Sequence, residues 1–286
     1  MKSSVTELIE RNSDAFLILI EIGAYGFRNL IAQYPNQIKN IGIFEPGTIG
    51  VAAGMALAGM VPTVYGISPF VVQRSLEQLK LDFIYQDLGG NFITTGASYD
   101  FSTLGYSHYC PEDIMTLKTL PGFEIVTPAT PAQFTSLFKQ CAEDGKCTYF
   151  RMTDHCCKTD IKVDFGKASV IKRGNNGVVV VFAELLDAVV DACLDLDVTI
   201  LYYSTASPFD YDALKRHCTG NKLVICHPFY EGTFSDDIQK ALNKTTEICE
   251  ISVPKQILRN YGTKNDKDQY LGLTASSIRQ RIVEFI

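Results

Sequence analysis

Short runs of apolar residues alternate along this chain with longer segments whose apolar positions recur every three to four residues. Ala15–Ile22 (AFLILIEI) and Gly177–Phe182 (GVVVVF) are the clearest runs, and each predicts a buried strand. We expect further strands over 40–44, 62–67, 91–95, 124–126, 148–151, 198–203, 223–226 and 247–253. We expect helices over 27–33, 49–60, 69–82, 111–119, 131–143, 184–196, 211–218, 234–242 and 274–285. Strands that alternate with helices in this way are typical of parallel sheets covered on both faces.

One polar, irregular stretch interrupts this rhythm. Residues 155–176 lack a clear apolar period and predict a linker followed by a small hairpin. The alternation resumes after it. The fold class we expect is therefore α/β, with two domains, each a mostly parallel sheet flanked by helices, over residues 1–158 and 159–286.

Composition narrows the class of protein. The chain has 286 residues, and its 26 basic and 32 acidic side chains give a net charge of −6. The hydrophobic content of 46% is that of an ordinary globular protein, which excludes a disordered tail or a fibre. Without a basic run we expect no nucleic-acid partner. Nine cysteines without a CxxC pair, and an N-terminus without an apolar leader, favour reduced thiols and a cytoplasmic location.

The longest uncharged segment raises the question of a membrane span. The 28 residues between Glu45 and Arg74 carry no formal charge. This segment nevertheless contains three prolines and five glycines, which predict a helix, a turn and a strand buried between protein layers. We therefore expect no membrane contact.

The carboxyl ends of the expected strands are where ligands bind in open α/β sheets. Glu45 follows one strand and precedes a helix rich in glycine and alanine. A carboxyl group buried there can hold or share a proton near neutral pH. The local sequence by itself favours the simpler interpretation, an acid that only stabilises the positive end of the helix.

Two further strand ends carry candidate residues. Tyr65 and Phe70 flank the next strand end, where an aromatic ring can stack on a flat heterocycle or simply pack in the core. The loop Gly96–Cys110 is long for a strand-to-helix connection, and such loops are often functional. His108 near its end is a candidate proton carrier, or an ordinary loop histidine.

Other chemistries lack their motifs. The chain has no GxGxxG, no GxxxxGK[ST] loop and no GxSxG elbow. His155, Cys156 and Cys157 are adjacent and lack a second pair at ligand spacing, so we expect no metal site on this chain.

Taken together, these places resemble the transketolase family, specifically its C-terminal half. The family's "GI-x-E-Q" and "VG-x-AAG-x-A-x-x-G" motifs correspond to GIFEPGTIGVAAGMALAG at 42–59. Its aromatic and "R-x-x-EQ" helix correspond to Phe70 and Arg74–Gln78. Its "G-x-(S/T)-H" loop, acidic pair and "PG" turn correspond to Gly105–His108, Glu112-Asp113 and Leu120–Gly122. The order holds over about 110 residues, and the second half is similar to the family's C-terminal domain.

The resemblance implies a role for each matched residue. Glu45 would be catalytic, sharing a proton with the aminopyrimidine of thiamine diphosphate. Phe70 would stack on that ring, and Tyr65 and Arg74 would join it in binding the cofactor. His108 would face the substrate and assist proton transfer to its oxygens. Arg151, at a strand end, would contact a substrate phosphate.

This sequence also departs from the family pattern. The usual Gln after the glutamate is Pro46, and an acidic position before the loop histidine is Leu104. Nothing matches the "GDG…N" segment that binds diphosphate and Mg²⁺ in the family's N-terminal domain. The chain therefore resembles the small subunit of a split transketolase, with Mg²⁺ held by a partner subunit and a heterotetramer as the assembly that the family implies.

The function that the resemblance implies is transfer of a two-carbon ketol, or a related acyl unit, between a ketose-type donor and an aldehyde sugar acceptor. One alternative is the beta subunit of a 2-oxoacid dehydrogenase decarboxylase component. Another is a non-catalytic assembly subunit that retains the thiamine fold. The sequence does not identify the donor or the acceptor.

Overall fold

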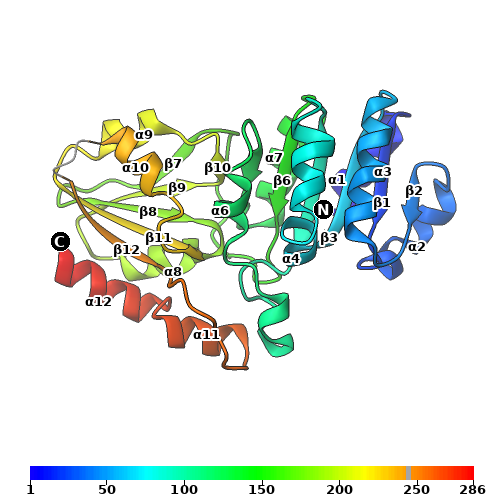
Figure 1. The fold of residues 1–286 in the computed structure, drawn as a ribbon. Coiled ribbons are helices and arrows are strands. Elements are labelled where there is room, and N and C mark those ends of the chain that lie inside the picture. Colours follow the sequence, from blue (N-terminus) through cyan, green and yellow to red (C-terminus); the bar gives the residue numbers. More distant parts are fainter. Residues whose placement is uncertain (243–245) are drawn as a thin grey trace.

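The computed structural model describes residues 1–242 and 246–286 and contains two sheets that lie side by side (Figure 1). The first half of the chain contains α1 (Lys2–Arg11), β1 (Ala15–Leu19), α2 (Ala24–Gln33), β2 (Ile38–Asn40), α3 (Glu45–Leu57), β3 (Val61–Ile67), α4 (Ser68–Val72), α5 (Leu76–Gln78), the π-helix η1 (Leu79–Ile84), β4 (Gly90–Thr95), the 3₁₀ turns η2 (Ser102–Leu104) and η3 (Tyr106–His108), α6 (Asp113–Leu117), β5 (Glu124–Val126), α7 (Pro131–Cys141) and β6 (Cys147–Arg151). The second half contains β7 (Ala168–Lys172), β8 (Val178–Phe182), the 3₁₀ turn η4 (Ala183–Leu185), α8 (Leu186–Ala192), β9 (Thr199–Tyr203), β10 (Thr205–Ser207), α9 (Tyr211–His217), β11 (Lys222–Tyr230), α10 (Ser235–Ala241), β12 (Glu247–Val253), α11 (Lys264–Leu271) and α12 (Ala275–Phe285).

The first sheet has the strand order β10-β5-β6-β4-β3-β1-β2. All of its pairings are parallel except that of β10 with β5. The second sheet has the order β12-β11-β8-β9-β7, and only β7 runs antiparallel to its neighbour. The expected class of two α/β domains is confirmed.

The division between the two domains is less simple than the expected boundary after residue 158. That position lies between β6 and β7, the last and first strands of the two halves in chain order. However, β10 belongs to the second half of the chain and pairs with β5 in the first sheet. The second domain therefore contributes an edge strand to the first, and the two domains share hydrogen bonds as well as side-chain contacts.

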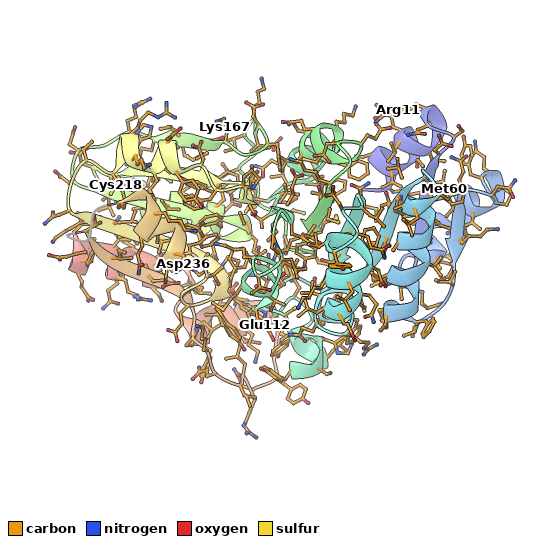
Figure 2. The ribbon with its side chains drawn as sticks, turned by 45° about the horizontal axis from the view of Figure 1, so that its top comes forward. Arg11, Met60, Glu112, Lys167, Cys218 and Asp236 are labelled. Carbon is orange, nitrogen blue, oxygen red and sulfur yellow. The ribbon has the colours of Figure 1, made fainter. Side chains whose placement is uncertain are left out.

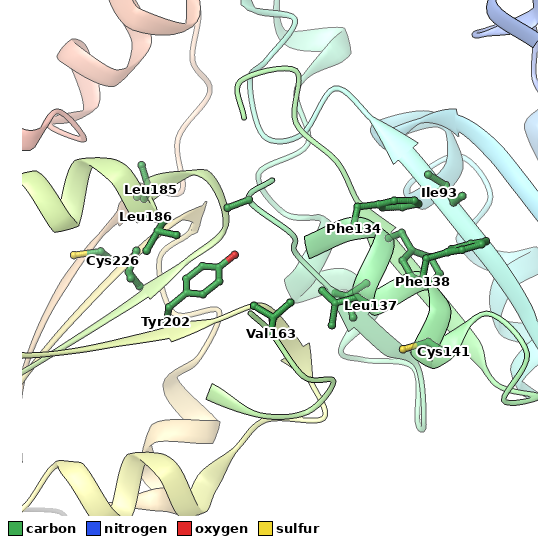
Figure 3. Packing of buried hydrophobic residues seen from close by; sticks show 14 of the residues in the cluster. Ile93, Phe134, Leu137, Phe138, Cys141, Val163, Leu185, Leu186, Tyr202 and Cys226 are labelled. Atoms are coloured by element: carbon green, nitrogen blue, oxygen red, sulfur yellow. The ribbon is translucent and has the colours of Figure 1, made fainter. Parts of the chain in front are cut away.

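Alternating burial along the strands produces two apolar layers. On β8, Val179 and Val181 face one layer, whereas Val178 and Val180 face the other. Each layer runs through both domains. Figure 3 shows this continuity: Val163 and Tyr202 lie between Leu186 of the second domain and the aromatic residues of α7 in the first.

Helices cover each sheet on both faces. In the first domain α1, α2 and α7 pack in one layer, while α3, α4 and α6 pack in the other. In the second domain α8 and α12 cover one face, and α9 and α10 cover the opposite one. Side chains cap the starts of α7, α9, α11 and α12. Before α7 the Thr130 side chain accepts from the Gln133 backbone N–H, and Pro131 follows in the first turn.

Four expectations for individual elements differ from the structure. The strand expected over 40–44 is instead β2 at Ile38–Asn40, and the chain is irregular over 41–44, where Gly42 has a φ of +79°. The helix expected over 69–82 is broken into α4, α5 and η1 by a turn at residues 73–75, where the buried Ser75 hydroxyl bonds the Phe70 carbonyl. The small hairpin expected within 155–176 consists of the single strand β7, which pairs with β9 instead. The sequence reading also missed α1, β10 and α11.

Among the described residues, no helix combines the length and the apolar character needed to cross a lipid bilayer.

Candidate active site

The candidate residues gather at the carboxyl edge of the first sheet. β3 and β4 are adjacent and parallel, with Ile67 opposite Thr95, so the segments that follow them leave the sheet side by side. The first leads into α4 with Phe70, and the second leads into the loop with His108. Glu45 begins α3, which packs against β3. The expectation that these three places meet at one edge follows from the parallel topology.

Glu45 and Arg74 form the ionic centre of this edge. The Glu45 side chain is only 5% exposed, and its Oε2 accepts a hydrogen bond from Arg74 Nη1 at 2.8 Å. The Arg74 side chain is 47% exposed, and its guanidinium carbon lies 4.2 Å from the centroid of the Phe70 ring. Arg74 therefore joins the buried carboxylate to the aromatic ring by contacting both.

His108 completes this group from the loop. Its ring centroid lies 5.3 Å from that of Phe70, edge to face, and 6.4 Å from that of Phe101. Its Nδ1 lies 3.1 Å from the Ser107 hydroxyl. The imidazole is half-buried, so it retains a surface that a ligand at Phe70 can reach.

Tyr65 lies beneath this edge and not on it. The residue is 9% exposed and belongs to the apolar layer formed with α2. Its ring packs against Gly23, where an added Cβ would approach Tyr65 Cε1 to 2.7 Å. Burial raises the pKa of its hydroxyl. The structure thus places Tyr65 as a support for the start of α2, separate from the Glu45–Phe70–His108 group.

Arg151 is enclosed. Its side chain is 1% exposed, and each of its three nitrogens donates a hydrogen bond. The acceptors are Asp113 Oδ2 at 2.9 Å, Glu184 Oε2 at 3.0 Å and the Ser98 hydroxyl. A guanidinium bonded through each of its nitrogens in this way joins α6, the His108 loop and the second domain.

The network around Arg151 contains residues that the sequence reading did not single out. Ser98 opens the His108 loop and forms a bridge with Cys110 at its end, and its hydroxyl donates to the Pro228 carbonyl. Glu184 follows strand β8 of the second domain. Their only sequence signal is position at a strand end, which many residues share.

The second domain also supports the outer part of the loop. Tyr99 donates to Asp268 of α11 at 2.7 Å, and Lys264 of α11 lies over the Tyr99 ring. At Gly105, where φ is +85°, an added Cβ would lie 2.7 Å from the Tyr261 ring. The close approach and the positive φ both require glycine here. The G-x-S-H turn is therefore shaped against the second domain.

One buried acid near this network is unusual. Burial, together with the neighbouring Glu184 carboxylate, raises the pKa of Asp100 to about 7. Asp100 Oδ2 accepts from the Asp154 backbone N–H at 3.0 Å, while its Oδ1 is unpaired. Asp100 therefore shares the base of the loop with the Glu184 carboxylate and with the cations of Arg151 and Lys264.

The residue types of the Glu45–Phe70–His108 group fit the pyrimidine half of a thiamine cofactor. A buried carboxylate beside an aromatic ring suits a flat ring with N–H donors, and the planar Arg74 cation already occupies such a position. Within the described residues, the close trio of metal-ligating side chains is Glu124, Cys141 and Asp144. This trio lies at the opposite, amino edge of the first sheet, away from Glu45.

Comparisons with known proteins show what this chain is similar to. Residues 20–156 match the family described as "Transketolase, pyrimidine binding domain". An uncharacterised 33.6 kDa protein of the fasciation locus of Rhodococcoides fascians is 32% identical, over 99% of this chain and 93% of that protein. One subunit of the apulose-4-phosphate transketolase of Phocaeicola vulgatus is 23% identical, over 99% and 95% of the two chains. Among solved structures, a split-gene transketolase described as an inactive beta4 tetramer has a TM-score of 0.86 at 19% identity, covering 99% of this chain and 95% of that one.

Proposed function

Because the chain belongs to the transketolase family, we propose that it is the small subunit of a split, thiamine diphosphate-dependent transketolase. It would transfer a two-carbon ketol unit from a ketose-type donor to an aldehyde sugar acceptor. The observation that carries this proposal is the Glu45–Phe70–His108 group at the carboxyl edge of the first sheet. A relative with the same extent is a subunit of an apulose-4-phosphate transketolase.

In this proposal Glu45 and Phe70 hold the pyrimidine of the cofactor. When bound, thiamine diphosphate supplies the carbanion-stabilising chemistry that ketol transfer requires. The Glu45 carboxylate holds or shares a proton with a ring nitrogen, and its burial strengthens that hydrogen bond. The Phe70 ring supports the flat face of the pyrimidine.

His108 assists at the substrate. Its half-buried imidazole lies at the edge of Phe70 and can give or take a proton at a sugar oxygen. We propose that Arg151 acts differently from the expected phosphate contact. Because all three of its nitrogens are already bonded, it positions Ser98 and the base of the His108 loop.

The partner subunit would complete the site. Large apolar side chains are exposed on and beside α3, at Phe44 just before it and at Val51 and Leu57 within it. Leu81 of the adjacent η1 segment and Tyr85 just after it are also exposed. Phe44 and Leu57 are each 62% exposed. Patches of this kind mark protein interfaces. We propose that the partner carries the diphosphate and Mg²⁺ site and docks here, that the assembly is a heterotetramer, and that it works in the cytoplasm.

Two alternatives make different predictions. A beta subunit of a 2-oxoacid dehydrogenase component would act with pyruvate, and a non-catalytic subunit would act with neither class of substrate. The presence of Glu45, Phe70 and His108 in one group favours a catalytic subunit. The names of the relatives favour a ketose donor.

The test is reconstitution with the companion subunit, using a ketose phosphate or pyruvate as donor. Glu45→Gln keeps the side-chain shape but cannot share a proton as a carboxylate does. We expect a loss of at least about 100-fold in turnover, as is typical for removal of a general acid–base group. Assembly, measured by analytical ultracentrifugation, should be unchanged.

Glu7→Gln, at an exposed position of α1, is the matched control and should retain full turnover. Full turnover in Glu45→Gln would refute the catalytic role of Glu45. Turnover of pyruvate but not of a ketose phosphate would replace the proposed function with the dehydrogenase alternative.

A further inference from the structure

Arg74 occupies the place that the proposed function assigns to the pyrimidine of the cofactor. Its guanidinium donates to Glu45 Oε2 at 2.8 Å and lies over the Phe70 ring at 4.2 Å. We propose that Arg74 is an internal occupant of the pyrimidine site, which holds Glu45 and Phe70 in the chain without cofactor and leaves when the cofactor binds. This inference rests on the proposed function.

The chemistry of the guanidinium explains why it can substitute for the ring. It is planar, it stacks on aromatic faces and it presents N–H donors in its own plane. A flat aminopyrimidine bound between the same two residues would use the same carboxylate and the same aromatic face. Arg74 holds Glu45 Oε2 and one face of the Phe70 ring, so a pyrimidine that uses the same oxygen and the same face displaces it.

The contacts of Arg74 are also those of a group that can leave. In the part of the chain that the structure describes, its side chain donates to Glu45 alone. It extends from the turn between α4 and α5, and it is 47% exposed, whereas Glu45 is 5% exposed. Departure of Arg74 therefore breaks one ion pair and one stacking contact, while the rest of the site stays in place.

The same ion pair explains why Glu45 keeps a partner when no cofactor is bound. A buried carboxylate without a partner is costly, so Glu45 retains a cation until another donor replaces it. An internal occupant lowers the apparent affinity for the ligand by the fraction of chains in which the site is free. If Arg74 fills the site in about 90% of chains, affinity falls about tenfold.

If Arg74 is an internal occupant, replacing it strengthens cofactor binding. If Arg74 instead binds the cofactor, replacing it weakens that binding. The experiment uses the full chain and thiamine as the probe, without Mg²⁺, with binding measured by ligand-observed NMR and by the shift in unfolding midpoint. Arg74→Gln removes the occupant, and we expect it to bind thiamine about tenfold more tightly than the unsubstituted chain. Arg28→Gln is the matched control. Arg28 lies over the Tyr25 ring at 4.0 Å on α2, so its loss should leave thiamine binding unchanged.

Arg74→Lys covers the case in which Arg74→Gln does not fold. Lysine keeps a cation near Glu45 but lacks the planar group that stacks on Phe70, so affinity should also rise, by a smaller factor. Unchanged or weaker binding in the folded Arg74 variants, with the unsubstituted chain still binding thiamine, would overturn the internal occupant and leave the proposed function standing. No binding by any of these chains at millimolar thiamine would also overturn the internal occupant, while turnover of the reconstituted enzyme decides the proposed function separately.

Discussion

At the residue scale, this chain encloses several ionisable groups whose environments differ sharply. Glu45 is enclosed but paired with one exposed arginine, so its contact is replaceable. Arg151 is enclosed by Asp113 and Glu184, and a buried cation paired with two carboxylates is held in place. The distinction separates a carboxylate available to a ligand from an arginine that positions other residues.

Glu124 gives a test of these environments that does not depend on function. It lies at the start of β5, its side chain is 5% exposed, and Thr148 Oγ1 donates to it at 2.9 Å. Burial and the neighbouring Asp144 raise its pKa from 4.5 to about 7. The folded chain therefore keeps this proton between pH 4.5 and 7, whereas the unfolded chain releases it.

Because the folded state binds more protons in that window, this group makes the chain less stable as pH rises through it. Glu124→Gln carries no charge at any pH, so the variant does not lose stability from this group as pH rises. We expect the variant to match the unsubstituted chain near pH 4 and to exceed it by about 1–2 kcal/mol at pH 8. Urea unfolding across that range measures the difference. A difference that is independent of pH would contradict this account of Glu124.

At the element scale, α3 performs two functions with two faces. Its buried face, which includes Ile49 and Ala52, packs on the first sheet. Its first turn presents Glu45, and its outer face remains apolar and exposed. The absence of charge between Glu45 and Arg74 thus has two causes, a buried sheet contact and a face suited to a partner subunit.

The outer face of α3 can be tested by one substitution. Val51 is 48% exposed, so Val51→Asp should change the free energy of unfolding of the chain by less than about 1 kcal/mol. A charge in an apolar interface is costly, and we expect at least a tenfold loss of affinity for the companion subunit. Val283→Asp, on α12 and 56% exposed, is the control and should assemble normally. Normal assembly of Val51→Asp would exclude this face as the docking surface.

At the scale of the whole molecule, the second domain supports the active-site edge of the first. β10 extends the first sheet, α11 packs against the His108 loop through Tyr99, and Lys118 pairs with Asp237 across the junction. Glu112, labelled in Figure 2, lies at this junction, where side chains from both halves meet. Glu184 reaches from the second domain to Arg151. The loop that carries His108 is therefore held from both sides.

The whole chain should bind thiamine diphosphate only weakly. It provides contacts for the pyrimidine, and we propose that the partner provides those for the diphosphate and metal. Calorimetry with the chain alone should give a Kd on the order of 1 mM, with no dependence on Mg²⁺. Micromolar, Mg²⁺-dependent binding by this chain alone would contradict the split site.

The sequence by itself determined the α/β class, most strands and helices, and the placement of Phe70 and His108 in segments that follow strands of the first sheet. Apolar periodicity and the order of motifs are local properties, so they are visible in one dimension. It did not determine β10, which pairs with a strand some 80 residues earlier, or the turn at 73–75 that divides an expected helix. Only the tertiary structure decided that Arg151 is enclosed and that Arg74 lies between Glu45 and Phe70. Burial and ion pairing depend on which distant segments meet, and a residue's type does not specify its neighbours.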